Sequence, residues 1–424
     1  MPPVSGASVA AVNNVVLEGW SPVAGGITAP DGFQAAGITA GLKASGKPDL
    51  SLLLAPQGAV CAGTFTTSVV RAACVDLCAE RLRQRAGLAR AVVTNSGQAN
   101  ACTGDRGLSD SLRITAAVAE SLGLTAEEVL ICSTGVIGVP IPTDTLLAGI
   151  QPLVAALSGQ GGDAAAQAIL TTDLIEKQIA VEADLDGRRV RIGGMAKGSG
   201  MIHPDMATML GYLTCDAGVP AEVWQAIVRR AVSRSFNAIT VDGDTSTNDT
   251  FLAFAAGDAL SPDQFDALEH GVTLVAQHLA RAIARDGEGA TCLLEVSVEG
   301  AASEAEAQCI ARTVCGSSLV KTAVHGRDPN WGRIVAAAGR SGASFDPAAV
   351  ALWLGTHQLM DGGQPIAFDR AAASAYLRGC AEGAYLQDDC VRIRLLVGNG
   401  VGHAQAWGCD LSDQYVRINA DYTT

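Results

Sequence analysis

Short apolar runs with the composition of β-strands alternate with helical stretches along the whole chain, and this alternation limits the possible folds more than any other feature. Residues 50–55, 91–94 and 129–132 are predicted to be strands buried on at least one face. Residues 293–298 and 391–397 repeat the pattern in the second half of the chain. Strands that alternate with helices in this way predict a mixed α/β protein with several layers.

Helices are predicted between these strands. Residues 108–122 form an amphipathic stretch that Gly123 closes, as glycine commonly does at the end of a helix. Residues 220–236 show the clearest apolar stripe, and the proline at their start suits the first helical position. Further helices are predicted over 263–285 and 367–382.

The composition supports a large folded core and argues against several kinds of partner. Hydrophobic residues make up 48% of the 424 residues and charged residues 17%, so we do not expect a disordered chain. The formal net charge of −14 would repel nucleic acids and anionic membrane surfaces, and neither is expected as a partner. No run of about 18 apolar residues is present, so no membrane span is predicted.

The N-terminus and the cysteines point to the cytoplasm. Residues 1–7 lack a basic region and an apolar core, so they do not resemble a signal peptide. The 12 cysteines are scattered and do not form a disulfide framework in a chain of this size. Cys74 and Cys78 can share one helix face, but no further metal ligands stand nearby. We therefore predict buried free thiols in a reducing cytoplasm, without a metal site.

The most unusual stretch is the glycine-rich segment 193–217, which runs into an alternating pattern from Thr208 onward. Its structural interpretation is a loop that enters a strand. Its functional interpretation is a threonine nucleophile, Thr208, at the first position of that strand. A threonine hydroxyl needs a base beside it. Cleavage of the chain just before Thr208 would supply an α-amino group, which titrates near about 8 and suits that task.

Other stretches also allow two interpretations. Residues 132–138 follow a predicted strand, where the Thr134 hydroxyl and the Gly135 N–H can stabilise an oxyanion, although an ordinary glycine turn has the same composition. The acidic run 241–249 lacks the spacing of an EF-hand, so a cation site is not predicted there. His203 stands close enough to Thr208 in sequence to suggest a general base, but we favour a solvated turn residue.

Several long segments carry a resemblance to a known family. They are APDGFQAAG at 29–37, GTFTT at 63–67, NSGQANACTG at 95–104, GMAKGSGM at 194–201, MATML at 206–210, NAITVDGDTSTND at 237–249, DPNWGR at 328–333 and INADYTT at 418–424. In this order they resemble the ornithine acetyltransferase family, the bifunctional glutamate N-acetyltransferases of arginine biosynthesis. The resemblance covers nearly the whole chain, and the segments around Thr208 are its most specific part.

The resemblance implies a layered α/β sandwich, similar to but distinct from that of N-terminal nucleophile hydrolases. It implies self-cleavage between Ala207 and Thr208 into an α chain, 1–207, and a β chain, 208–424, which assemble as α2β2 or larger. It also implies acetyl transfer from N-acetylornithine to glutamate through an acetyl-threonine ester, with ornithine and N-acetylglutamate as products. Acetyl-CoA remains open as a second donor, and neither a cofactor nor a metal is expected.

The functional positions of the family correspond to residues of this chain. Thr208 matches the nucleophile, and Thr134 with Gly135 matches the oxyanion-binding pair. The substrate-contacting positions correspond to Thr171, Lys197, Thr208, Glu288, Asn419 and Thr424. A lysine at such a position can meet a substrate α-carboxylate, and a glutamate can hold an amine.

Three residues beside these positions depart from the family pattern. Asp205 stands where many members have asparagine, Leu174 replaces a common threonine, and Thr423 replaces a common arginine. None of them removes a predicted catalytic group. We expect them to affect the cleavage rate or the substrate preference.

Two other functions stay open on the sequence. An N-terminal nucleophile aminopeptidase or amidase shares the self-cleavage but uses water as the acceptor. A non-enzymatic amino-acid-binding protein predicts one intact chain of 43.2 kDa.

Overall fold

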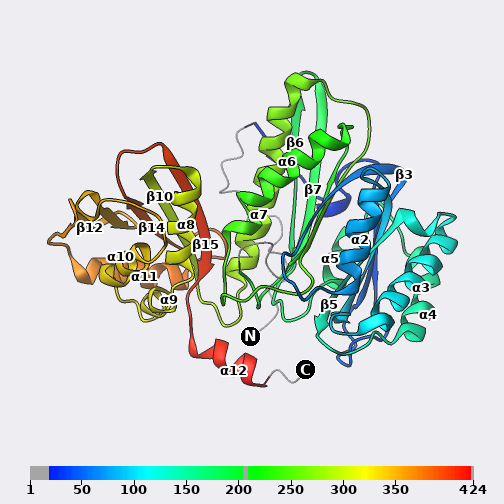
Figure 1. Ribbon diagram of the computed structural model, residues 1–424, viewed down its shortest axis with the longest axis horizontal. Coiled ribbons are helices and arrows are strands. Elements are labelled where there is room, and N and C mark those ends of the chain that lie inside the picture. The colour runs from blue at the N-terminus through cyan, green and yellow to red at the C-terminus, as the bar shows by residue number, and fades with distance from the viewer. Residues whose placement is uncertain (1–18, 204–208, 422–424) are drawn as a thin grey trace.

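The computed structural model describes residues 19–203 and 209–421 of the chain. Within these residues, two α/β bodies lie side by side, each built on one β-sheet (Figure 1). The first body carries a nine-stranded sheet and the second a six-stranded sheet among the described residues. The predicted layered α/β architecture is confirmed.

The nine-stranded sheet contains strands from both sides of the predicted cleavage point. Its order is β1 (Ser21–Pro22), β6 (Lys177–Leu185), β7 (Arg188–Lys197), β8 (Leu210–Cys215), β9 (Thr250–Ala255), β3 (Leu50–Phe65), β4 (Leu88–Gln98) and β5 (Val129–Val136), and β2 (Gln34–Ile38) pairs with β3 beside this path. β7 pairs with β8 antiparallel, and β8 pairs with β9 parallel. The parts of the chain before 204 and after 208 are therefore interleaved in one sheet.

Both faces of this sheet are buried. Along β9, Phe251 and Ala253 belong to one hydrophobic cluster, whereas Leu252 and Phe254 belong to another, as the alternation of a strand requires. The first face is covered by α6 (Ala221–Ser233) and α7 (Phe265–Arg285). The second face is covered by α2 (Ala73–Gln84), α3 (Gly104–Leu122), α4 (Thr143–Ala155) and α5 (Gly162–Ala168).

The six-stranded sheet has a core of its own. Its order is β13 (Gln364–Pro365), β12 (His357–Asp361), β11 (Ala351–Leu354), β14 (Cys390–Leu396), β10 (Leu293–Ala301) and β15 (Gly402–Cys409). The helices that pack into this core are α8 (Glu304–Cys315), α9 (Ser318–His325), α10 (Trp331–Gly339) and α11 (Arg370–Glu382). The last helix, α12 (Asp413–Asp421), lies apart from both bodies in Figure 1, and none of its residues is buried.

Most predicted elements are confirmed, with different ends. The predicted strands and helices at 91–94, 129–132, 263–285, 293–298, 367–382 and 391–397 are present as β4, β5, α7, β10, α11 and β14. β3 extends beyond residue 55 to Phe65, because it pairs first with β4 and then with β9. α3 begins at Gly104 rather than at 108, and Pro220 is the N-cap of α6 rather than its first residue.

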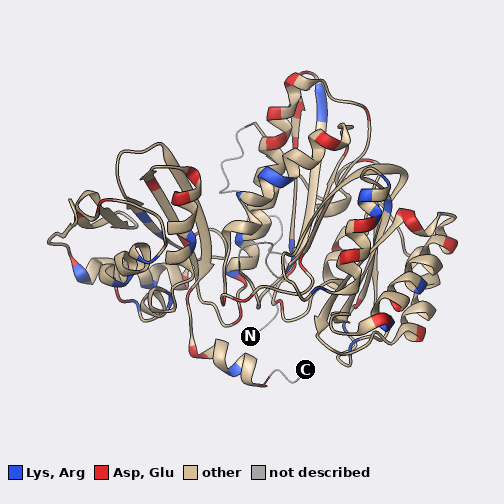
Figure 2. Ribbon diagram, in the orientation of Figure 1, with Lys and Arg blue, Asp and Glu red and all other residues tan. Residues whose placement is uncertain are grey.

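The other general features of the described residues can be stated briefly. Cys74 and Cys78 are buried free thiols, as predicted. No helix in the described part of the chain has both the length and the apolar composition to cross a membrane. Residues 19–203 and 209–421 contain no group of three or more His, Cys, Asp or Glu side chains that could hold a metal ion. Acidic and basic residues are interspersed over both bodies (Figure 2).

Candidate active site

A cavity of about 220 Å³ brings together the described residues that the sequence predicts as a site. Six of these predicted residues line it: Thr134, Gly135, Thr171, Lys197, Glu288 and Asn419. Ala207, Thr208 and Thr424 lie outside the described residues, as do the departures Asp205 and Thr423. The strand predicted to start at Thr208 is present as β8 and begins at Leu210.

The cavity also has a lining that the sequence did not predict. These residues are Ala99, Ile137, Thr172, Gly200, Met201, Ser246, Thr247 and Asn248. Ile137, Thr172 and Gly200 stand within three positions of predicted site residues, so closeness along the chain is a signal for them. Ser246, Thr247 and Asn248 belong to the acidic run 241–249, where the sequence analysis predicted no site.

Two glycines shape the corner of the cavity that Thr134 and Gly135 form. Gly135 has φ of +128° and its parallel partner on β4, Gly97, has φ of +127°. A Cβ atom at Gly135 would stand 2.3 Å from the carbonyl carbon of Gly97, which is closer than any real contact. β5 therefore ends in a backbone conformation that needs glycine, directly after the buried Thr134.

A buried network of two lysines and two aspartates supports another wall. Lys177 Nζ lies 2.7 Å from Asp173 Oδ1 and 2.6 Å from Asp286 Oδ2. Lys197 Nζ lies 3.8 Å from Asp173 Oδ2. All four residues are buried, and their charges balance, which is the condition under which ionised groups are tolerated inside a protein.

The network determines how these groups ionise. Burial alone would raise the pKa of Asp173, but the charges of Lys177 and Lys197 outweigh it and hold that pKa well below its usual range. Burial alone would lower the pKa of Lys177, but Asp173 and Asp286 outweigh it and raise that pKa. For Lys197, burial prevails over the attraction of Asp173 and lowers the pKa. A lysine in this setting gains from a second anionic partner, such as a substrate carboxylate in the cavity.

The same aspartates hold the backbone of two cavity walls. Asp173 Oδ2 accepts a hydrogen bond from the Thr171 N–H at 3.0 Å, and Asp173 Oδ1 accepts one from the Gly198 N–H at 2.6 Å. Asp286 Oδ2 accepts one from the Leu174 N–H at 3.0 Å. The side chain of Leu174, one of the departures from the family pattern, is 79% exposed, so this residue faces solvent beside the cavity.

Glu288 and Asn419 form a hydrogen-bonded pair in the lining. Asn419 Nδ2 donates to Glu288 Oε2 at 2.7 Å, which connects α12 to the cavity. The Glu288 N–H donates to the Ser199 carbonyl at 3.1 Å. A Cβ atom at Gly200 would stand 2.6 Å from the carboxylate carbon of Glu288, so glycine at 200 leaves the space that the carboxylate occupies.

The acidic run 241–249 holds the chain on both sides of segment 204–208. Asp242 accepts hydrogen bonds from the Met201 N–H at 2.5 Å and from the Ile202 N–H at 2.9 Å. Asp249 Oδ1 accepts one from the Met209 N–H at 2.9 Å. These carboxylates accept hydrogen bonds from backbone N–H groups.

His203 is less exposed to solvent than the sequence predicts. Its side chain is half-buried, and its Nδ1 lies 3.1 Å from Thr240 Oγ1. The turn packs against the segment around Thr240, because the Val241 N–H also donates to the Ile202 carbonyl at 2.7 Å. Pairing across this sequence distance could not be seen from the local pattern.

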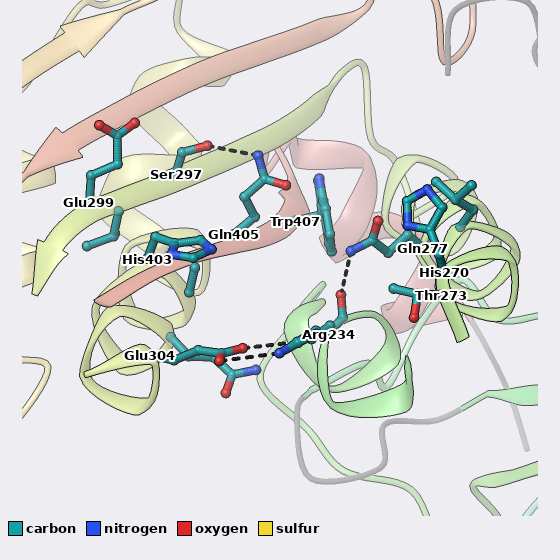
Figure 3. A pocket seen from close by; sticks show the side chains of 14 residues that line it. Arg234, His270, Thr273, Gln277, Ser297, Glu299, Glu304, His403, Gln405 and Trp407 are labelled. Atoms are coloured by element: carbon teal, nitrogen blue, oxygen red, sulfur yellow. Dashed lines mark hydrogen bonds and ion pairs between the residues drawn. The ribbon is translucent and has the colours of Figure 1, made fainter. Parts of the chain in front are cut away.

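A larger cavity of about 560 Å³ lies elsewhere, where α7 and α8 meet the β10–β15 edge of the six-stranded sheet (Figure 3). None of the predicted site residues lines it. Its charged side chains already have partners: Arg234 Nε lies 3.1 Å from Glu304, and Glu299 lies 3.2 Å from Arg394 Nε. The smaller cavity, with its unusual backbone and buried charges, is therefore the candidate active site.

Comparison with known proteins gives one consistent result. The ArgJ family model matches residues 34–424. The arginine biosynthesis bifunctional protein ArgJ of Prochlorococcus marinus strain MIT 9313 is 70% identical over 414 residues, which cover 98% of this chain and 97% of that protein. The protein of the same name from Parasynechococcus marenigrum is 70% identical over 405 residues, which cover 96% of this chain and 97% of that protein.

Two solved structures are also similar in sequence. The arginine biosynthesis bifunctional protein of Bacillus halodurans is 39% identical, and the match covers 49% of this chain and 97% of that chain, with a TM-score of 0.45. The ornithine acetyltransferase of Mycobacterium tuberculosis, complexed with ornithine, is 44% identical, and the match covers 44% of this chain and 98% of that chain, with a TM-score of 0.40.

Proposed function

The chain belongs to the ArgJ family, and from this premise we propose that it transfers an acetyl group from N-acetylornithine to glutamate in arginine biosynthesis. The observation that carries the proposal is the cavity in which Thr134, Gly135, Lys197 and Glu288 meet. It combines a candidate oxyanion-binding corner with a buried cation and a carboxylate. An amino acid that carries an amide needs these three kinds of group.

In the proposed reaction Thr208 is the nucleophile. Its hydroxyl oxygen attacks the acetyl carbonyl carbon, and its α-amino group takes the hydroxyl proton. Thr134 and Gly135 donate hydrogen bonds to the oxyanion. The C–N bond then breaks, ornithine leaves with the proton on its amine, and the acetyl group remains on Thr208 as an ester.

The second half of the reaction uses the same groups in reverse. The amine of glutamate attacks the ester carbonyl, its proton passes to the α-amino group, and the Thr208 oxygen leaves and is reprotonated as N-acetylglutamate forms. One amide is exchanged for another, so no cofactor or metal is needed. Water has to be kept out, because it would hydrolyse the ester.

The substrate contacts follow from the charges of the cavity. We assign the α-carboxylate of the substrate to Lys197, and its amine or amide to Glu288 and Asn419, with Thr171 and Thr424 as further contacts. Ornithine is the ligand of the Mycobacterium tuberculosis relative, and we propose it as a ligand of this cavity. The buried, charge-balanced network to which Lys197 belongs supports this assignment. Asp173 lies 3.8 Å from the Lys197 ammonium and holds it in place, and the ammonium can still bind a second anion.

The proposal includes maturation of the chain. We propose that it cleaves itself between Ala207 and Thr208 into chains of 207 and 217 residues, which act as one unit in an α2β2 assembly in the cytoplasm. Both halves contribute strands to one sheet, which supports their staying together after a cut. A mass measurement of the native protein tests the assembly.

A denaturing gel with N-terminal sequencing tests the proposed function most directly. We expect two fragments, the second beginning Thr-Met-Leu, and formation of N-acetylglutamate from N-acetylornithine and glutamate. Thr208→Ala should stay in one piece and lose acetyl transfer. An intact chain with full transferase activity would contradict the mechanism. Release of acetate without glutamate would instead support an amidase, and an intact chain that only binds amino acids would support a binding protein.

Acetyl-CoA is proposed as a second acetyl donor, because the relatives with 70% identity carry the name bifunctional protein. Incubation of the protein with acetyl-CoA and glutamate tests this second activity. We expect N-acetylglutamate together with free CoA. Transfer from N-acetylornithine alone would show a monofunctional enzyme.

A further inference from the structure

Two adjacent residues, Asn248 and Asp249, have side chains that point to different parts of the candidate active site. They stand directly before β9, and their exposed fractions are 5% and 0%. Polar side chains this deeply buried are expected to be fully hydrogen-bonded or to serve a function. Neither residue has a role in the reaction as described so far.

The Asn248 amide joins the ends of β4 and β5. Its Nδ2 donates to the Ser133 carbonyl at 2.8 Å and to the Ala99 carbonyl at 2.5 Å. Its Oδ1 accepts from Thr247 Oγ1 at 2.5 Å. Two carbonyls can only accept and a hydroxyl can donate, so the orientation of the amide is determined by its partners.

These hydrogen bonds act on the oxyanion-binding corner. The Ser133 carbonyl belongs to the peptide group that enters Thr134, and Ala99 follows the end of β4, whose Gly97 is paired with Gly135. Among the described residues, β5 is the last strand in the order of the sheet, so none of their strands pairs with its other side. The side chain of Asn248 therefore fixes an edge strand at the point where its backbone turns.

Asp249 holds the beginning of β8 in the same way. Its Oδ1 accepts the Met209 N–H at 2.9 Å, and the next residue, Thr250, donates its N–H to the Met209 carbonyl at 3.1 Å. Met209 is the residue that follows Thr208 in the chain. Two neighbouring residues thus hold two parts of the site. Asp249 binds Met209, the first described residue after the proposed nucleophile, and Asn248 binds the strand that carries Thr134 and Gly135.

We propose that Asn248 and Asp249 are positioning residues that set the spacing between the oxyanion-binding corner on β5 and the start of β8. The inference rests on the proposed function, since it assigns a role within that reaction. A displacement of about 1 Å between reacting groups can slow an enzyme by about 100-fold, so a rigid spacer of this kind has a measurable effect.

Only one carboxylate oxygen of Asp249 takes part in positioning β8. Oδ2 is buried and has no hydrogen-bond partner in the described part of the chain. Burial raises the pKa of Asp249 well above its usual range. A spacer needs only the oxygen that accepts the Met209 N–H, and asparagine keeps such an oxygen.

The first test is Asn248→Ala, measured on the purified two-fragment protein. We expect kcat/KM for N-acetylornithine to fall by about 100-fold, while the Kd for ornithine, measured by calorimetry, stays close to that of the unchanged protein. The matched control is Asn330→Ala, which removes the N-cap of α10 in the second body. The Asn330 side chain donates to Asp328 at 2.9 Å and accepts from the Arg333 N–H at 3.1 Å. It should lower stability without changing kcat/KM. Failure of Asn248→Ala to cleave itself, while Asn330→Ala cleaves, would also support the spacer.

The second test compares Asp249→Ala with Asp249→Asn. The alanine variant should lose about as much kcat/KM as Asn248→Ala, and the asparagine variant should recover most of it. Equal losses in both variants would overturn the proposal, because they would show that a hydrogen-bond acceptor for the Met209 N–H is not what this position supplies. Full activity of Asn248→Ala would overturn it as well. The proposed function stands in both cases if the unchanged protein transfers acetyl groups and Thr208→Ala does not. Failure of the positioning proposal can therefore be told apart from failure of the proposed function.

Discussion

Lys177 Nζ lies 2.7 Å from Asp173 Oδ1 in the interior of the protein, and this ion pair ties the 171–174 segment to the strand that leads away from it. The side chains of both residues are fully buried. Asp173 uses its other oxygen on the Thr171 N–H, beside the candidate active site. A charge pair that is not itself in the cavity thus determines where part of the lining stands.

Removal of Lys177 should destabilise the protein strongly. Lys177→Met leaves Asp173 and Asp286 buried without their shared cation, and breaking a buried pair in this way typically reduces the free energy of unfolding by about 3–5 kcal/mol. Urea unfolding monitored by circular dichroism measures the change. The control is Arg83→Ala, which removes an exposed ion pair with Glu80 and should leave the free energy of unfolding almost unchanged. Equal effects in the two variants would contradict the structural role of the network.

Gly135 should not tolerate a side chain. Gly135→Ala would place a Cβ 2.3 Å from the carbonyl carbon of Gly97, and the backbone shift should displace the oxyanion-binding corner. Loss of one oxyanion contact commonly lowers kcat by about 100-fold to 1,000-fold. Gly138→Ala is the matched control, because Gly138 also has a positive φ, +82°, but a Cβ there meets nothing within 4 Å. This variant should lose about 1–2 kcal/mol of stability and keep its activity. Steady-state kinetics on both variants decide the prediction.

Lys197 should contribute to ligand binding more than to folding. Lys197→Met removes the ammonium that faces the cavity, and a hydrogen bond to a charged group is worth about 1.5–3 kcal/mol. The Kd for ornithine should therefore rise by about 10-fold to 100-fold. Lys47→Met, at an exposed position, serves as the control and should leave the Kd unchanged. Unaltered ornithine binding in the Lys197 variant would show that the carboxylate is held elsewhere.

His278 should make stability depend on pH in a defined window. Burial on α7 lowers the pKa of His278 to about 4, with a smaller contribution from Arg281. The unfolded state binds a proton near about pH 6.5, whereas the folded state resists it until about pH 4. As the pH falls through this window, the free energy of unfolding should fall by at most about 1.4 kcal/mol per pH unit from this residue. His278→Gln should reduce that slope between pH 6.5 and 4 but not above pH 7. Parallel pH profiles of the two proteins would contradict the assignment.

Much of the fold could be predicted, because its strands and helices are encoded locally. The apolar runs of β4 and β5 and the glycine that closes α3 are examples in which neighbouring residues carry enough information. The full length of β3 was missed, because its second half is a strand only through its pairing with β9. The predicted start of α6 at Pro220 differs from the observed start by one residue, because the first residue of a helix depends on the backbone angles of a single turn.

The sequence predicted part of the candidate site but not the buried residues that support it. Local chemistry drew attention to Thr134 and Gly135, and the family resemblance added Thr171, Glu288 and Asn419. The sequence offered no signal that Lys177 would be buried, since its partner Asp286 is 109 positions away. No role was predicted for Asn248 and Asp249, because the sequence does not show which backbone groups their side chains meet.

The sequence by itself determined the alternation of strands and helices, the supply of reactive side chains and the family to which they belong. These properties depend on residues that are close along the chain, or on matching segments in order. Only the tertiary structure decided that the end of β5 and the start of β8 come together in one sheet, and that Asp173 and Asp286 balance the charges of Lys177 and Lys197 in the protein interior. Pairing of distant strands and burial of charge depend on the whole packed fold, because no local segment can shield an ion from water or bring its partner to it.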